Sequence, residues 1–364
     1  MLAVQLLEWG SAPELRDIPV PEPTGEQLLL EVTAAGLCRS DLSVCDAPAG
    51  RFDYPLPHTL GHEVAGRVVA AGPDADGGTV GSSVVVHGVW SCRICRNCRR
   101  DRENYCLALQ PVDGRLAVIG NGLGAPGGLA EYMVVPHSGV LVDTGSLAPE
   151  LAAPLADAGA TVHHAVSGQA DLLDSNAVVV IVGVGGLGHL AVRMASLLGA
   201  GHVVAVDPRD AARRSASTMG ATAVYSSLAE AASATKDLGG VDVVFDFVGS
   251  DDTMAEGLAT LVPGGRLVVV GGAGGSVSVA KNRGIAAGWQ VSAPFWGSRA
   301  DLVEVVALAE SGALLPEVTT RPLDEAIDAY ARLRAGEDAG RIVLLPNTSD
   351  DPTPERDAGK DHRQ

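Results

Sequence analysis

Residues 178–188 read VVVIVGVGGLG, five β-branched residues followed directly by a glycine-rich turn. The apolar run predicts a buried strand, and the turn has the spacing G-x-G-x-x-G. Gly183 permits a tight turn, Gly185 lets a pyrophosphate approach the backbone, and Gly188 allows the following helix to pack closely on the strand. The sequence therefore predicts a dinucleotide-binding loop that comprises Gly183, Gly185, Gly186, Leu187 and Gly188.

An aspartate follows the next apolar run in the position that such a site requires. The apolar run 203–206 is followed directly by Asp207, which lies nineteen residues after Gly188. A carboxylate there can accept hydrogen bonds from both ribose hydroxyls and would repel a 2′-phosphate, which favours NAD over NADP. The nearby Arg209, Arg213 and Arg214 keep NADP as the less favoured option. A turn or cap before Pro208 is the alternative role for Asp207.

The pattern around this loop divides the chain into two parts. From about residue 177, apolar strands alternate with helical segments (177–182, 186–198, 203–206, 209–219, 241–247, 252–261 and 267–270), which is typical of a doubly wound parallel sheet. Residues 1 to about 150 are rich in short β-branched runs and are predicted to be mostly β (28–32, 64–69, 84–86 and 132–135). We also expect a helix over 301–311, a strand over 341–344 and a disordered tail over 347–364.

Composition limits the classes of protein and partner. The chain has 364 residues, enough for about two domains, and a formal net charge of −18. Such a charge disfavours nucleic acid as a partner. The sequence contains no secretory signal and no apolar run that approaches the roughly 20 residues needed to span a bilayer. We therefore expect a cytoplasmic protein with no membrane partner.

Four cysteines lie within fifteen residues, at positions 92, 95, 98 and 106. This spacing lets four thiolates close on one ion, which is the coordination that structural Zn²⁺ prefers. Disulfide pairing is the alternative, and the reducing compartment disfavours it. We predict a structural zinc held by Cys92, Cys95, Cys98 and Cys106.

Two further candidate ligands precede this cluster. Cys38 lies in the stretch GLCRSD and His62 in GHEVAG. Each alone is more often a buried or turn residue. Together with a carboxylate and an open coordination position they would suit a catalytic zinc.

The chain resembles the zinc-containing medium-chain alcohol dehydrogenases. The segment 61–66, GHEVAG, followed by Gly72 and Ala75, matches the signature of that family, and Cys38, the cysteine cluster and the glycine loop fall in the order of that family. Within it, residues 34–38, 157–159, 246–249 and 295–299 are most similar to bacterial NAD-dependent secondary alcohol dehydrogenases, several of which reduce aryl ketones. The resemblance covers residues 1 to about 346.

The resemblance implies the ligands of a catalytic zinc. Cys38 and His62 match two ligands, and Asp157 stands where relatives have Cys or Asp. Glu63 matches a residue behind the metal that either orients the site or displaces water from the ion; both roles stay open.

The resemblance also implies contacts with substrate and cofactor. Ser40 matches the hydroxyl that hydrogen-bonds the alcohol and accepts its proton, and Thr161 matches a nicotinamide contact. The outer proton relay is open, because Arg39 follows Cys38 without the histidine that many relatives have nearby. The remaining cofactor positions are Arg39, Val248, Gly271 and, toward the pyrophosphate, Arg341.

Three positions correspond to the substrate pocket of the relatives: Ser43, Tyr54 and Trp296. Ser43 stands where relatives have a histidine or an aromatic residue, so we expect a roomier pocket that accepts bulky or aryl ketones. Tyr54 and Trp296 are also compatible with a purely structural role as core or interface aromatics.

The resemblance implies an α/β architecture with a mostly β, GroES-like catalytic domain over 1–157 and 300–346 and a Rossmann cofactor domain over 158–299. We expect hydride transfer between NAD(H) and a secondary alcohol or ketone, with a homodimer or homotetramer assembled at an edge strand near residues 289–292. Alternatives are a zinc enzyme acting on an imine or polyol, and a non-catalytic NAD-binding relative.

Overall fold

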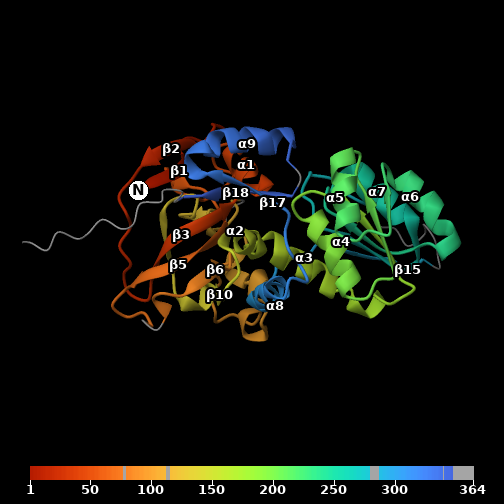
Figure 1. The fold of residues 1–364 in the computed structure, drawn as a ribbon, viewed down its shortest axis with the longest axis horizontal. Coiled ribbons are helices and arrows are strands. Elements are labelled where there is room, and N and C mark those ends of the chain that lie inside the picture. The colour runs from red at the N-terminus through yellow and green to blue at the C-terminus, as the bar shows by residue number, and fades with distance from the viewer. Residues whose placement is uncertain (77–78, 112–114, 279–286, 339, 347–364) are drawn as a thin grey trace, which may run out of the picture.

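The structure is a computed structural model that describes residues 1–76, 79–111, 115–278, 287–338 and 340–346. The predicted tail over 347–364 lies outside the described residues. Two bodies lie side by side in Figure 1, the first built mostly from the N-terminal half of the chain and the second from the strands and helices around the glycine loop. Among the described residues, no helix combines the length and apolar content needed to cross a membrane.

The strands and helices alternate more regularly in the second half of the chain than in the first. The α-helices are α1 (Arg39–Cys45), α2 (Pro149–Ala152), α3 (Ala158–Ser167), α4 (Gly188–Leu197), α5 (Asp210–Thr218), α6 (Leu228–Ala234), α7 (Asp251–Thr260), α8 (Arg299–Glu310) and α9 (Ala326–Ala335). The strands of the first half are β1 (Leu2–Leu6), β2 (Glu14–Asp17), β3 (Leu28–Gly36), β4 (His58–Thr59), β5 (Glu63–Ala71), β6 (Ser83–Val86), β7 (Gly120–Asn121), β8 (Gly124–Ala125), β9 (Tyr132–Val135) and β10 (Leu141–Asp143). Those of the second half are β11 (Val178–Val182), β12 (His202–Val206), β13 (Ala223–Tyr225), β14 (Val241–Asp246), β15 (Leu261–Val269), β16 (Gln290–Ser292), β17 (Val318–Pro322) and β18 (Arg341–Leu345).

The predicted parallel sheet is confirmed. Six of the described strands form it in the order β13-β12-β11-β14-β15-β16, with every pairing parallel. Strand β11 lies in the middle and is buried along its whole length, because helices cover both faces of the sheet. From β11 the chain first adds strands on one side of the sheet, β12 and then β13, and afterwards on the other side, beginning with β14. Such sheets bind their ligands at the place where the strand order switches in this way.

A second sheet belongs mainly to the first half of the chain, as the β-branched runs predicted. Its described strands follow the order β10-β6-β5-β3-β18-β17, with β9 also paired to β3. The last strand of the chain returns to this sheet, because β18 pairs antiparallel with β3 and parallel with β17. The return of the chain to this sheet places Arg341, at the start of β18, in the middle of the molecule.

Helices α3 and α8 lie between the two sheets (Figure 1). Leu302, Val305 and Val306 of α8 join the apolar core that also contains β11, whereas Ile342 and Leu344 of β18 join the core of the first half. We retain the domain boundaries at 157/158 and 299/300 as a proposal.

Several element boundaries differ from the expectations. Helix α4 begins at Gly188 rather than at residue 186, because the backbone first turns through Gly183, whose φ is +85°, and residues 184–187 lie in the loop. Strand β15 begins at Leu261, six residues earlier than predicted. Helices α3 and α9 had no sequence prediction, although Ala326, Ala329 and Tyr330 of α9 are buried at helical spacing.

Candidate active site

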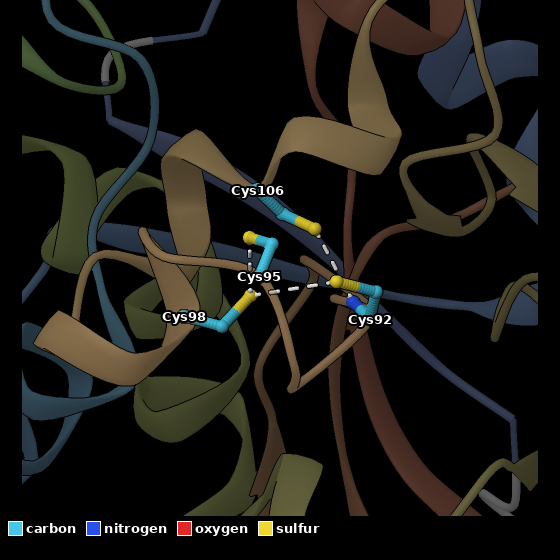
Figure 2. Close-up of side chains that lie close together, drawn as sticks. All are labelled: Cys92, Cys95, Cys98 and Cys106. Atoms are coloured by element: carbon cyan, nitrogen blue, oxygen red, sulfur yellow. Dashed lines mark hydrogen bonds between the residues drawn. The ribbon is translucent and has the colours of Figure 1, made fainter.

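The four-cysteine cluster is formed as the spacing predicted. One sulfur from each of Cys92, Cys95, Cys98 and Cys106 lies within 4.8 Å of the others. The sulfur of Cys98 is 3.4 Å from that of Cys95 and 3.9 Å from that of Cys92, and Figure 2 shows all four side chains converging on one point. The chain reaches this geometry through short 3-10 turns over 98–100, 103–105 and 107–109. Four sulfurs at these distances fit tetrahedral zinc.

Backbone amides hydrogen-bond two of these thiols, whereas burial raises the pKa of a third, Cys98, to about 12. The amide N–H of Cys92 donates to the sulfur of Cys106 at 3.3 Å, and that of Leu107 donates to the sulfur of Cys95 at 3.5 Å. Hydrogen bonds from the backbone N–H groups of Cys98 and Leu107 lower the pKa of Cys95 to about 6. Stabilised thiolates are what a metal ion requires.

A second set of metal-binding side chains is assembled from three separate parts of the chain. Cys38 precedes α1, His62 and Glu63 lie at the start of β5, and Asp157 lies between α2 and α3. One ligand atom from each of these four buried residues lies within 4.8 Å of the others. The sulfur of Cys38 is 3.5 Å from Asp157 Oδ2, and His62 Nε2 is 3.7 Å from the same oxygen. The arrangement offers a thiolate, an imidazole and a carboxylate to one ion.

Electrostatics in this cluster favour the ligand forms of the acids. Burial and the nearby Asp157 carboxylate raise the pKa of the Cys38 thiol, but the Arg341 guanidinium and His62 together hold that pKa below its usual value. Burial also opposes ionisation of Asp157, yet His62 and Arg341 keep the pKa of Asp157 well below its usual range. Both shifts favour the anionic forms that bind a metal ion.

Asp41 belongs to the site although sequence reasoning did not select it. It is fully buried in the first turn of α1, and its Oδ1 accepts from His62 Nδ1 at 3.0 Å. Its Oδ2 accepts from the backbone N–H of Cys38 at 2.9 Å. A carboxylate on Nδ1 leaves Nε2 as the nitrogen that faces the cluster. The available signal was an acid three residues after Cys38, at a helix start.

Glu63 and Arg341 connect the cluster to the glycine loop. Arg341 Nη2 hydrogen-bonds Glu63 Oε1 and lies 3.2 Å from Asp157 Oδ2. The same side chain packs against the loop, because a Cβ placed on Gly186 would lie 2.8 Å from Arg341 Cδ. Both Arg341 and Glu63 are buried, and Glu63 Oε2 has no hydrogen-bond partner in the described part of the chain. Burial raises the pKa of Glu63 well above its usual value.

The glycine loop has the close approaches that its sequence predicted. A Cβ on Gly188 would lie 2.0 Å from the carbonyl oxygen of Gly183, so only glycine fits there. At Gly185 a Cβ would meet no described atom within 4 Å, which leaves room beside the backbone for a ligand. Val248 and Gly271 lie next to the loop, with a Val248 methyl 2.7 Å from a Cβ built on Gly183. Leu187 is the N-cap of α4.

Asp207 lies beside the loop as predicted, but its carboxylate is heavily engaged. Its Oδ2 accepts from the backbone N–H of Val184 and from Arg209 Nη2, each at 2.9 Å. Its Oδ1 accepts from the backbone N–H and Nε of Arg209, at 2.9 and 3.0 Å. Arg213 contacts the carbonyl oxygen of Asp207, and Arg214 is exposed.

The substrate-pocket candidates are dispersed. The Trp296 ring meets the His62 imidazole edge-on, with centroids 5.6 Å apart. Tyr54 is buried, stacks on Phe52 at 4.7 Å, and has a hydroxyl with no partner among the described residues. Ser43 is exposed and donates within α1 to the carbonyl of Arg39 at 3.2 Å.

The remaining candidates lie near the cluster or the loop. Ser40 Oγ is 3.7 Å from the sulfur of Cys38 and is solvent-exposed. Thr161 donates from Oγ1 to Asp157 Oδ1 at 3.2 Å. Arg39 is exposed, and its Nη2 would lie 3.8 Å from a Cβ on Gly336.

Comparison with known proteins agrees with this arrangement. Residues 24–144 match the alcohol dehydrogenase GroES-like domain, and residues 186–311 match the zinc-binding dehydrogenase domain. An NAD-dependent alcohol dehydrogenase of Sulfolobus acidocaldarius is 33% identical over 94% of this chain and 99% of its own length.

Solved structures show the same likeness. The alcohol dehydrogenase of Aeropyrum pernix superposes with a TM-score of 0.86 at 31% identity, over 95% of this chain and 100% of the other. Acetophenone reductase from Geotrichum candidum, in complex with NAD, superposes with a TM-score of 0.81 at 30% identity, over 94% and 97%. The chain belongs to the zinc-containing medium-chain alcohol dehydrogenases and is an oxidoreductase.

Proposed function

We propose that this protein transfers a hydride between NAD(H) and a secondary alcohol or ketone at a zinc ion held by Cys38, His62 and Asp157. The observation that carries the proposal is the convergence of these three side chains, with Glu63, within 4.8 Å of one another. Arg341 contacts both this cluster and the glycine loop, so the metal ligands and the dinucleotide loop face a common space. Hydride transfer requires that proximity.

The donor set fits zinc. One thiolate and one carboxylate would neutralise the charge of the ion, and the imidazole would complete a three-ligand set of the kind that catalytic zinc takes. Bound zinc supplies Lewis acidity toward the alcohol or ketone oxygen, and bound NAD supplies the hydride acceptor. We assign the four-cysteine cluster to a structural zinc with no part in the reaction.

The residues of this chain would then position the substrate and move its proton. Ser40, next to Cys38 and exposed to solvent, would relay the hydroxyl proton of the alcohol, accepting that proton as its own hydroxyl proton passes to water. Thr161 anchors the carboxylate of Asp157, and we keep it as the proposed contact of the nicotinamide. Glu63 holds Arg341 between the two sites. We keep Arg341 as the proposed partner of the pyrophosphate and Arg39 as a proposed cofactor contact.

We further propose that NAD is preferred over NADP. Support comes from the buried carboxylate of Asp207 at the end of β12, where a 2′-phosphate would meet negative charge. Arg209 is already paired with that carboxylate.

The test of the proposed function is a substrate panel. NADH oxidation would be followed with acetophenone, an aliphatic ketone and a cyclic imine, and NAD reduction with a polyol, each before and after treatment with a chelator. We expect the protein to reduce the ketones, and we expect the chelator to abolish this activity. Turnover of the imine or polyol alone would replace the proposed substrate class, and NADH binding without turnover of any substrate would indicate a non-catalytic relative.

The pocket is proposed to accept bulky or aryl ketones. The chain has Ser43 where an aromatic ring would narrow the space, and it is similar to a protein described as an acetophenone reductase. Replacing Ser43 with Phe is expected to lower kcat/KM for acetophenone by about tenfold relative to a small aliphatic ketone, because a lost pocket volume of this size changes discrimination by about 1–3 kcal/mol. An unchanged ratio between the two ketones would rule out this role for Ser43.

A further inference from the structure

The backbone at Trp296 adopts a conformation that a residue with a side chain rarely takes. Its φ is +53°, in the left-handed region that favours glycine, although Trp296 is a large, buried residue. Strained backbone of this kind persists only when the surroundings hold it in place. The contacts around Trp296 therefore decide where its ring lies.

Three hydrogen bonds hold this turn, one on each of three consecutive residues. Asn104 Nδ2 donates to the carbonyl of Phe295 at 2.9 Å. The indole Nε1 of Trp296 donates to the carbonyl of Ala156 at 2.9 Å, directly before Asp157. His87 Nε2 lies 2.9 Å from the carbonyl of Gly297.

Close packing leaves the turn no alternative position. A Cβ on Gly297 would lie 2.4 Å from the carbonyl oxygen of Ala160 in α3, and one on Gly88 would lie 2.3 Å from the Trp296 ring. The indole is thus fixed between α3 and the segment after β6. On its remaining side it meets the His62 imidazole.

The hydrogen bond to the Phe295 carbonyl comes from residues 92–106, the four-cysteine segment. Asn104 lies two residues before Cys106, in the 3-10 turn Glu103–Tyr105, and is 1% exposed. Both neighbours contact the same region. Glu103 Oε1 accepts from the backbone N–H of Arg299 at 2.5 Å, and the Tyr105 hydroxyl lies 3.0 Å from His164 Nε2.

The contact through His164 has a defined polarity. His164 Nδ1 lies 2.9 Å from the Asp301 carboxylate, which can only accept, so this nitrogen carries the proton and Nε2 accepts from Tyr105. Asp301 in turn caps α8 through Ser298. The turn that carries Cys106 is therefore attached to both α3 and the start of α8.

We propose that Asn104 is a positioning residue through which the four-cysteine segment holds Trp296 against the substrate site. The four-cysteine segment then does more than stabilise its own loop: it sets one wall of the pocket. This inference rests on the proposed function, because that function places Trp296 beside the substrate.

The test compares Asn104→Ala with Asn97→Ala. Asn97 is the matched control, since it lies in the same segment and its Nδ2 donates to the carbonyl of Tyr105 without contacting residues 295–297. We expect Asn104→Ala to raise the KM for acetophenone by about tenfold, because the hydrogen bond to the Phe295 carbonyl and the longer 3.4 Å contact with His164 Nε2 are both lost, while kcat stays within about twofold. Asn97→Ala is expected to keep the wild-type KM, and both variants to keep both zinc ions.

A spectroscopic measurement gives a readout that does not depend on turnover. Loss of the Asn104 hydrogen bond is expected to shift the Trp emission of the zinc-loaded protein to longer wavelength, because the Trp296 indole becomes more exposed. The shift should be absent when Asn104→Ala is made in a Trp296→Phe background. If Asn104→Ala fails to fold, Asn104→Leu keeps a similar side-chain volume and removes the donor without adding a charge, since Asn104 Oδ1 has no hydrogen-bond partner among the described residues.

The outcomes separate the two proposals. An unchanged KM and emission in a folded Asn104 variant would overturn the positioning role, whatever the substrate. Equal effects of Asn97→Ala and Asn104→Ala would also overturn it, since the segment would then act only through its general stability. A wild-type protein that reduces no ketone would refute the proposed function, while the emission shift would still decide the role of Asn104.

Discussion

Asp41 is the residue on which the orientation of the catalytic cluster depends most directly. One of its oxygens accepts from the His62 ring and the other from the Cys38 backbone. The carboxylate therefore connects two ligands that lie on different elements. Neither partner can rotate without breaking a buried, charge-assisted hydrogen bond.

Replacing Asp41 with Asn is therefore expected to weaken the catalytic zinc. The loss of a carboxylate behind a ligating histidine typically lowers metal affinity by about 10–100-fold. Dialysis against graded chelator, followed by metal analysis, would measure this loss, and the structural zinc should be retained. Asp46→Asn is the control, because Asp46 is exposed and pairs only with Arg334 among the contacts of the described chain. Equal zinc retention in both variants would contradict the role of Asp41.

At the level of the elements, the structure shows which contacts connect α4 to the last strands. His189, fully buried in α4, lies with Nδ1 2.9 Å from the carbonyl of Gly185 and accepts at Nε2 from the backbone N–H of Glu317 at 3.1 Å. One ring nitrogen must donate and the other must accept, so the imidazole is neutral. Burial lowers the pKa of His189 to about 4.

This histidine makes stability depend on pH. The unfolded chain binds a proton at His189 near pH 6.5, whereas the folded chain binds it only near pH 4, so the unfolding free energy falls as the pH decreases through that window. The difference corresponds to about 3 kcal/mol. Urea unfolding of the zinc-loaded protein at pH 7 and pH 5 would measure how much unfolding free energy is lost between the two pH values. We expect this loss to be smaller for His189→Gln than for the wild type. Parallel losses in the two proteins would contradict this assignment.

Sequence patterns predicted the elements whose signals are local. The strand β11, the glycine loop and the four-cysteine cluster each lie within a short stretch, so spacing alone defined them. The cluster of Cys38, His62 and Asp157 needed the family resemblance, because its members are far apart in the chain. The double contact of Arg341 and the left-handed backbone of Trp296 had no local signal, since long-range packing imposes both.

At the scale of the whole molecule, the parallel sheet ends in a strand with an open edge. Among the described residues β16 pairs only with β15, and its three residues are exposed. This is the edge that the sequence analysis selected for assembly. We retain a homodimer or homotetramer formed there as a proposal, because an unprotected edge favours pairing with a second strand.

Replacing Val291 in this edge strand with Lys is expected to disrupt the assembly, since a charge on the edge opposes pairing. Light scattering coupled to size exclusion should show the wild type at twice or four times the chain mass and the variant at a lower multiple. Val303→Lys is the control, because Val303 is similarly exposed, at 40% against 37%, on α8. A wild-type monomer, or an assembly that Val291→Lys leaves intact, would move the interface elsewhere.

The proposed reaction depends on the cluster of Cys38, His62 and Asp157 being the reactive metal site. The most direct measurement is the zinc content of the purified wild type and of Cys38→Ser, together with chelator-sensitive reduction of acetophenone by NADH. We predict two zinc ions per chain in the wild type and one in the variant, whose turnover falls by about a thousandfold as several kcal/mol of transition-state stabilisation are lost. A variant that kept both ions, or that turned over within tenfold of the wild type, would contradict the central claim.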